Sequence, residues 1–151
     1  MQATAYLHFN GDCEAALRFY EQALGAEVDC LIPFEGTPAE HEAPAEYLRK
    51  VLHGRIKLNG QTIMASDCPP GRYKKPQGFA LSLGVKDAAE AHRVFEALAN
   101  GGTVNMPLQE TFWAVRYGSV TDRFGTPWMV NCEKGLDLPA QEEEHAYAGR
   151  R

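Results

Sequence analysis

One sequence repeat constrains this chain more than any other feature. Residues 12–21 (DCEAALRFYE) and 87–96 (DAAEAHRVFE) match at a fixed offset of 75 residues, sharing Asp, Ala, Arg and Glu. An apolar, strand-like run precedes each copy, at 4–9 and 79–85, and β-rich sequence follows each. A duplicated unit usually buries its apolar face against its twin, so the repeat predicts two copies of one module. The simpler alternative is two unrelated amphipathic helices that share an Asp cap and an apolar stripe.

The segments around the repeat predict the order βαβββ twice. Asp12 and Asp87 are expected helix N-caps, Gly25 a helix stop, and Asn59-Gly60 a hairpin turn. In the first half we expect a helix after Asp12 and strands at 6–9, 27–34, 51–58 and 62–66. In the second half we expect a helix at 87–99 and strands at 79–85, 104–108, 114–121 and 127–132. This order indicates an α+β fold with the helices on one side of curved, mainly antiparallel sheets.

The predicted elements divide the chain into two modules. The first module covers 1–68 and contains a Pro-, Glu- and Ala-rich excursion at 35–50. Residues 69–78 hold three prolines and two glycines and are expected to form the linker. The second module covers 79–133, and a polar tail with three consecutive glutamates follows at 134–151. We expect that tail to be frayed or disordered.

Composition narrows the classes of function. The net charge is −5 and the pI is near 5.5, which argues against a nucleic-acid partner, because such a partner requires a basic surface. No apolar run approaches the length of a membrane span, and the N-terminus lacks a signal pattern. The four cysteines are scattered without zinc-site spacing and are expected to be free thiols. Together these features predict a cytoplasmic protein.

Several segments together resemble one known superfamily. The stretches YLHFNGDCEAALRFY, IMASDCPP, MPLQETFWA and VTDRFGTPWMVN are similar to the vicinal oxygen chelate superfamily. That is the glyoxalase, bleomycin-resistance and dihydroxybiphenyl-dioxygenase group, and the resemblance is to its PhnB-like branch. It covers residues 3 to about 133. The resemblance implies two βαβββ modules forming a cupped mixed sheet, and a homodimer. A ubiquinone-pathway methyltransferase name is sometimes attached to this branch, but the chain has no Gly-rich strand-to-helix turn for a nucleotide-like cofactor.

The resemblance also implies where a metal would be held. Superfamily enzymes typically bind a divalent metal inside the cup through His, Gln or Glu from the first and last strand of each module. In this chain the first-strand position falls on Ala5, which the repeat offset carries to Ala80. The last-strand position falls on Met129 and on Met64, or on Ala65 if the hairpin slips by one residue. These side chains offer no nitrogen or oxygen donor, so we expect no metal cofactor.

Strand alternation assigns faces to the histidines. If Ala5 faces the cup, Leu7 and Phe9 do so too, and His8 points toward the helices. In the strand at 51–58, His53 and Arg55 should lie opposite the helix-facing apolar residues. There they either bind an anionic small molecule through charge-assisted hydrogen bonds or simply face solvent.

The second half contributes further candidates for ligand contact. Trp113 and Trp128 are either core residues or an apolar wall for a ligand. Gln109 lies just before the first of them, and parity directs Asn131 and Ser82 into the cup. The predicted ligand-binding set is therefore His53, Arg55, Ser82, Gln109, Trp113 and Asn131.

Two acidic residues, Asp67 and Glu110, lie near the ends of predicted strands. Each is either an exposed charge or turn cap, or a catalytic base.

Two functions remain open on the sequence. The first is a small-molecule-binding protein without a metal, whose ligand is anionic or aromatic and whose catalytic activity is undetermined. The second is a metal-dependent enzyme of the glyoxalase, fosfomycin-resistance or extradiol-dioxygenase type that uses shifted ligands such as His8, His53 or Glu110. The missing donors at the aligned positions favour the first, since the fold itself hosts many chemistries.

Overall fold

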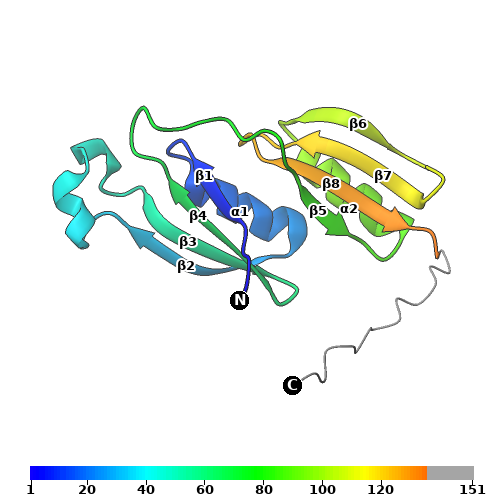
Figure 1. Ribbon diagram of the computed structural model, residues 1–151, viewed down its shortest axis with the longest axis horizontal. Coiled ribbons are helices and arrows are strands. Elements are labelled where there is room, and N and C mark those ends of the chain that lie inside the picture. The colour runs from blue at the N-terminus through cyan, green and yellow to red at the C-terminus, as the bar shows by residue number, and fades with distance from the viewer. Residues whose placement is uncertain (136–151) are drawn as a thin grey trace, which may run out of the picture.

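The computed structural model describes residues 1–135 and contains two βαβββ modules, as the repeat predicts (Figure 1). The first module consists of β1 (Tyr6–Phe9), α1 (Cys13–Leu24), β2 (Glu27–Pro33), β3 (Val51–Leu58) and β4 (Gln61–Asp67). The second consists of β5 (Leu81–Gly84), α2 (Ala88–Ala99), β6 (Thr103–Gln109), β7 (Ala114–Thr121) and β8 (Pro127–Glu133). The excursion before β3 carries two short 3-10 helices, η1 (Pro38–Glu42) and η2 (Ala45–Tyr47). The predicted tail lies outside the described residues from position 136 onward.

The two sheets have the same topology. Their strand orders are β1-β4-β3-β2 and β5-β8-β7-β6, with the pairs β1–β4 and β5–β8 parallel and the other neighbours antiparallel. The sheets lie side by side with β1 and β5 at their inner edges, and both helices cover the same side (Figure 1). The side without helices is called the open face below. The α+β prediction is confirmed.

Each helix packs an apolar stripe onto its sheet. The buried positions are Cys13, Ala16, Leu17, Tyr20 and Ala23 in α1, and Ala91, Val94, Phe95 and Leu98 in α2. Gly25 ends α1 in a left-handed conformation and donates its N–H to the Glu21 carbonyl. The Asp87 carboxylate caps α2 by accepting the Glu90 N–H at 2.8 Å, as predicted.

The cap at α1 differs from the prediction. The Asp12 side chain makes no capping hydrogen bond. The buried Asp67 carboxylate instead accepts the Cys13 N–H at 2.9 Å and the Val51 N–H at 2.8 Å. Asp67 therefore ties the ends of β4, α1 and β3 together, which is a structural role for one of the two candidate bases.

The prediction of facing in the first strand is wrong. Leu7 and Phe9 are buried in the core with the helices, whereas His8 is exposed beside Tyr6 on the open face. Strand register explains the error. Leu7 of β1 lies opposite Ala65 of β4, and in the same way Leu83 of β5 lies opposite the core residue Val130 of β8. The inner strands therefore repeat at an offset of 76 residues rather than 75. The first module has one more residue between strand and helix, at a turn where Gly11 adopts φ +91°.

That offset also separates the two alanines that the resemblance aligned. Ala5 corresponds in register to Leu81 and is half-buried, whereas Ala80 is exposed. They do not occupy equivalent places, although the modules themselves are equivalent.

The modules contact each other through α1 and the β7–β8 turn. The Tyr20 hydroxyl donates to the Asp122 carboxylate at 2.6 Å, and its ring meets that of Trp128 edge-on at 5.2 Å. Phe19 packs against Phe124 with ring centroids 5.6 Å apart. One hydrophobic core runs through both modules as a result.

The described cysteines are free thiols, two of them buried, as the spacing predicts. Among residues 1–135, no helix has the length and apolar character needed to cross a bilayer.

Candidate functional site

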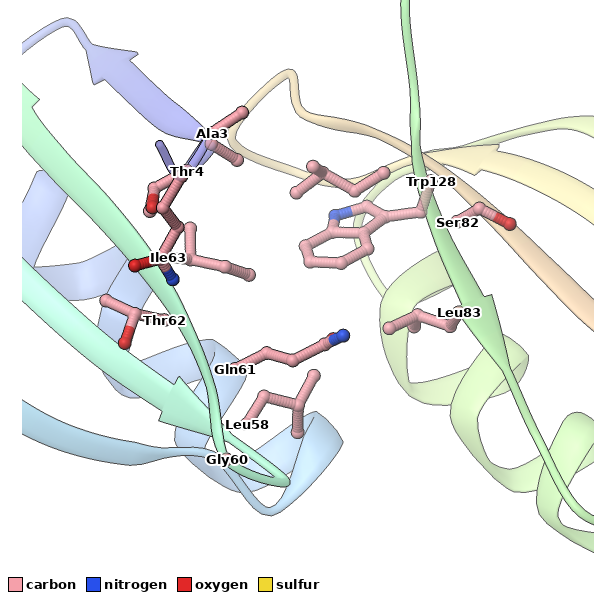
Figure 2. A pocket seen from close by; sticks show the side chains of 13 residues that line it. Ala3, Thr4, Leu58, Gly60, Gln61, Thr62, Ile63, Ser82, Leu83 and Trp128 are labelled. Atoms are coloured by element: carbon pink, nitrogen blue, oxygen red, sulfur yellow. The ribbon is translucent and has the colours of Figure 1, made fainter. Parts of the chain in front are cut away.

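A cavity of about 330 Å³ opens between the two modules (Figure 2). Its walls are the segment that leads into β1, the β3–β4 hairpin, strand β5 and the start of β8. The lining residues are Gln2, Ala3, Thr4, Ala5, Leu58, Gly60, Gln61, Thr62, Ile63, Leu81, Ser82, Leu83 and Trp128. Its volume lies at the lower end of the range typical of small-molecule sites.

The cavity lining is uncharged and mixed in character. Gln2 and Gln61 supply amides, and Thr4, Thr62 and Ser82 border the cavity, although the Thr62 and Ser82 hydroxyls point away from it (Figure 2). Figure 2 shows the Gln61 side chain extending across the space toward the second module, and the Trp128 ring facing Ile63. Such a surface suits an uncharged molecule with apolar area and a few hydrogen-bonding groups, since a charged ligand would meet no opposite charge there.

Trp128 is held in place from behind the cavity. Its indole Nε1–H donates to the Asp122 carboxylate at 2.9 Å, and the residue is almost completely buried. That carboxylate also accepts the Tyr20 hydroxyl, the Phe124 N–H at 2.8 Å and the Thr126 N–H at 3.1 Å. Burial, together with the nearby Asp122 charge, raises the pKa of the Tyr20 phenol far above its ordinary value, so Tyr20 is a neutral donor. Trp128 is therefore a core residue whose ring reaches the cavity wall.

Of the predicted ligand-binding residues, Ser82 lines this cavity and the other five lie elsewhere. His53 and Arg55 lie in β3, where the buried Gly54 and Ile56 alternate with them. The Tyr6 hydroxyl is 3.1 Å from His53 Nδ1.

Arg55 and Lys57 both form ion pairs with Asp29 of β2. Hydrogen bonds from Arg55 and then Lys57 hold the pKa of the Asp29 carboxyl below its usual range. The positive charge that was predicted to attract an anion is thus already paired on the protein, which weakens the case for an anionic ligand at this face.

Gln109, Trp113 and Asn131 gather on the open face of the second sheet. Tyr117 of β7 lies directly opposite Gln109 on one side and Asn131 on the other. The Trp113 ring meets the Tyr117 ring at a centroid distance of 5.4 Å. Tyr117 was not among the predicted residues, although its alternation with the core residues of β7 is a usable signal.

The residues present do not fit the metal that the superfamily implies. On the inner strands the open-face positions are Tyr6 and His8 in β1, Met64 and Ser66 in β4, Ser82 in β5, and Met129 and Asn131 in β8. Divalent ions of this kind need three or four nitrogen or carboxylate donors together. Among residues 1–135, no group of three His, Cys, Asp or Glu side chains is placed to hold an ion.

The residues predicted as shifted metal ligands lie in different modules. His8 and His53 both flank Tyr6, with ring centroids 5.1 Å and 5.8 Å from it. Glu110 lies in the second module, where an ion pair with Lys134 at 2.7 Å lowers the pKa of its carboxyl. An ionised, exposed and paired carboxylate of this kind is a poor general base.

The chain is similar to known proteins in both sequence and structure. The sequence model of the family described as 3-demethylubiquinone-9 3-methyltransferase matches residues 1–131. Protein YjdN of Escherichia coli K12 is 37% identical over 142 residues, which cover 89% of this chain and 97% of YjdN. The crystal structure of protein PA1353 from Pseudomonas aeruginosa superposes with a TM-score of 0.80 at 45% identity, covering 88% of this chain and 98% of that one.

More distant structures share the fold. The PhnB protein from Bacillus cereus has a TM-score of 0.75 at 23% identity and covers 87% of this chain and 99% of its own. The fosfomycin resistance protein FosX from Listeria monocytogenes has a TM-score of 0.61 at 10% identity, covering 89% of this chain and 92% of its own. Likeness at these identities concerns the fold alone.

Proposed function

Because this chain belongs to the PhnB-like family described as 3-demethylubiquinone-9 3-methyltransferase, with the glyoxalase and bleomycin-resistance fold, we propose that it is a small-molecule-binding protein that holds its ligand without a resident metal. The family description names a methyltransferase, but the residues of this chain do not support that activity. The strand-to-helix turns at 10–12 and 86–87 have no Gly-rich pattern for a nucleotide-like cofactor.

The cavity between the modules is the observation that carries this proposal. It is lined by the amides of Gln2 and Gln61 and by the apolar side chains of Leu58, Ile63, Leu81, Leu83 and Trp128. Such a lining favours a small, uncharged ligand with an apolar or aromatic body and one or two polar groups.

The absence of suitable donors supports the metal-free part of the proposal. The positions that the resemblance assigns to metal ligands are Ala5, Ala80, Met129 and Met64 or Ala65, and none of them supplies a nitrogen or oxygen donor from its side chain. Metal analysis of untagged protein after chelation is expected to give far less than one equivalent of zinc, nickel or manganese. One equivalent that persists in the parent protein and disappears in His53→Ala would support the metal-dependent alternative.

The binding test uses N-phenyl-1-naphthylamine, an uncharged aromatic probe whose fluorescence rises in apolar surroundings. We expect saturable binding by the parent protein and at least a tenfold weaker affinity in Ile63→Trp, because the Ile63 side chain points into the cavity toward Trp128 and a larger ring there fills it (Figure 2). Thr62→Trp is the matched control, because Thr62 is the neighbouring residue of β4 and its side chain points away from the cavity (Figure 2). The cavity is not the binding site if Ile63→Trp binds the probe as the parent does, or if both variants weaken it equally.

A further inference from the structure

We propose a second binding site, on the helix side of the sheets, for an amphiphilic anion: a molecule with an apolar body and one negatively charged head group. The site is a groove of about 410 Å³ between the two modules. Its walls are the C-terminal end of α1, the β3–β4 turn, the end of β5 and the first half of α2 (Figure 1). This proposal goes beyond the proposed function, because the cavity described above takes an uncharged ligand.

The floor of the groove is apolar and comes from both modules. Leu24 of α1 and Leu58 of β3 belong to the first module. Leu83 of β5 and Val85, which follows that strand, belong to the second. All four are half-buried and pack against the hydrophobic core. Leu83 lies opposite the core residue Val130 of β8, which places this floor on the helix side and not on the open face.

Two cationic side chains stand at the rim of the groove, Lys86 and Arg93. Within residues 1–135, Lys86 forms no ion pair. Arg93 lies 3.8 Å from a Glu90 carboxylate oxygen, which is too long for a hydrogen bond, and its side chain is 60% exposed. The donors of both cations are therefore available to a ligand.

Glu90 is the one carboxylate among the lining residues, and it is already engaged. It accepts the Lys86 N–H at 3.0 Å, and the Asp87 carboxylate accepts the Glu90 N–H at 2.8 Å. These bonds occupy backbone N–H groups at the start of α2, so an anion would be held by side chains and not by the helix end. The lining carries two positive charges against one negative charge, in a chain whose net charge is −5.

The combination of floor and rim selects an amphiphile. Exposed ion pairs contribute little by themselves, so a small anion at the rim alone would bind weakly. Burial of an apolar body on the floor supplies the larger share of the affinity, and the two cations fix which end of the molecule faces them. Leu58 and Leu83 also border the cavity between the modules, but no charged residue lines that cavity.

The first test uses 8-anilino-1-naphthalenesulfonate, which is N-phenyl-1-naphthylamine with one added sulfonate group. We expect saturable binding of this anionic probe to the parent protein by fluorescence titration. Its affinity should fall about threefold in Lys86→Gln and about tenfold in the double variant Lys86→Gln, Arg93→Gln, in line with exposed ion pairs. The affinity for the uncharged probe should not change in either variant. Lys75→Gln is the control, because it removes the same charge from an exposed lysine outside the groove.

A displacement experiment tests the chemical class of the ligand. Dodecanoate should displace the anionic probe from the parent protein. Dodecyltrimethylammonium has the same chain with a cationic head and should not displace it, because the rim is positively charged. Butyrate has the same head with a short chain and should not displace it either, because it leaves most of the apolar floor uncovered. All three are compared at one concentration below micelle formation.

Four results would overturn the proposal. The first is an unchanged affinity for the anionic probe in the double variant. The second is an equal loss in Lys75→Gln, which would indicate attraction to overall charge and not to this groove. The third is displacement by butyrate or by dodecyltrimethylammonium that equals displacement by dodecanoate. The fourth is loss of the anionic probe in Ile63→Trp, which would place that probe in the cavity.

The two binding sites can fail separately. Ile63→Trp fills the cavity and should weaken the uncharged probe alone, whereas the double variant at the rim should weaken the anionic probe alone. If the uncharged probe does not bind the parent protein but the anionic probe binds and depends on Lys86, the cavity proposal fails and the groove proposal stands.

Discussion

Two glycines allow the helices to lie close to the sheets. A Cβ atom at Gly54 in β3 would come within 2.8 Å of Leu17 Cδ1 in α1, and one at Gly118 in β7 within 2.8 Å of Phe95 Cε2 in α2. The two glycines occupy equivalent strands of the two modules, so a missing side chain allows the helix to lie close to the sheet in both. Interiors packed this densely cannot absorb even one added methyl group without a shift of the neighbours.

We predict that Gly118→Ala destabilises the protein more than Gly54→Ala. At Gly118 the added methyl would also meet the Leu108 backbone at 3.0 Å, whereas at Gly54 the closest atom is the end of a flexible side chain. The expected losses are roughly 2–3 and 1–2 kcal/mol, in line with overpacked cores. Urea denaturation followed by circular dichroism measures both. A smaller loss at Gly118 than at Gly54 would contradict this account of the packing.

The helices and strands could be predicted from the sequence, but the direction in which the side chains of β1 face was predicted wrongly. The helices and strands were predicted because their apolar periodicity, caps and turns are local signals, as at Gly25 and Asn59-Gly60. The facing of β1 was missed because the helix repeat of 75 was applied to a strand that repeats at 76. A single added residue reverses every side chain of a strand. The length of the strand-to-helix turn, which differs between the modules, carried that information.

At the scale of elements, the β7–β8 turn joins the two modules. Asp122 organises this turn by accepting two backbone N–H groups, and it also accepts donors from Tyr20 in the other module and from Trp128. The carboxylate is buried, so each donor offsets part of the cost of removing its charge from water. The same network orients the Trp128 ring that reaches the cavity wall.

We predict that Tyr20→Phe lowers the free energy of unfolding by roughly 1.5–3 kcal/mol, the usual range for a hydrogen bond to a charged group. The substitution keeps the ring against Trp128 and removes only the hydroxyl. Tyr6→Phe is the control, because its hydroxyl bonds to His53 at the surface and should change stability by less than about 0.5 kcal/mol. Urea denaturation at pH 7 compares them, and equal effects would mean that Tyr20 contributes through packing alone.

At the scale of the whole molecule, the candidate site depends on features that no single segment encodes. The cavity forms where the β3–β4 hairpin of one module approaches β5 and β8 of the other. Thr4, Gln61 and Thr62 line it, but none stands out in its own segment as a binding residue. Strand parity predicted that Ser82 faces the cup, whereas the lining of this cavity follows from how the modules pack. Sequence periodicity reports which side of an element is buried and not which elements meet.

The open faces of the two sheets carry apolar side chains that a partner could bury. Ile32 in the edge strand β2 is 41% exposed and lies opposite His53, and Met106 in the edge strand β6 is 40% exposed and lies opposite Ser119. These positions belong to equivalent strands of the two modules. Exposed edge strands with apolar residues are commonly covered by another chain, and a twofold dimer is the commonest way to do so.

We therefore predict a homodimer, as the superfamily resemblance also implies. Light scattering at about 50 µM, where even modest interfaces persist, should give twice the 16.7-kDa mass of one chain. Ile32→Glu and Met106→Glu should shift the protein toward the mass of one chain, because each places an unpaired charge in the proposed interface. Phe79→Glu is the control, since Phe79 is a more exposed apolar residue that precedes β5 and lies outside both sheets. A parent protein with the mass of a single chain would contradict the dimer, and equal shifts in all three variants would contradict its placement on the sheet edges.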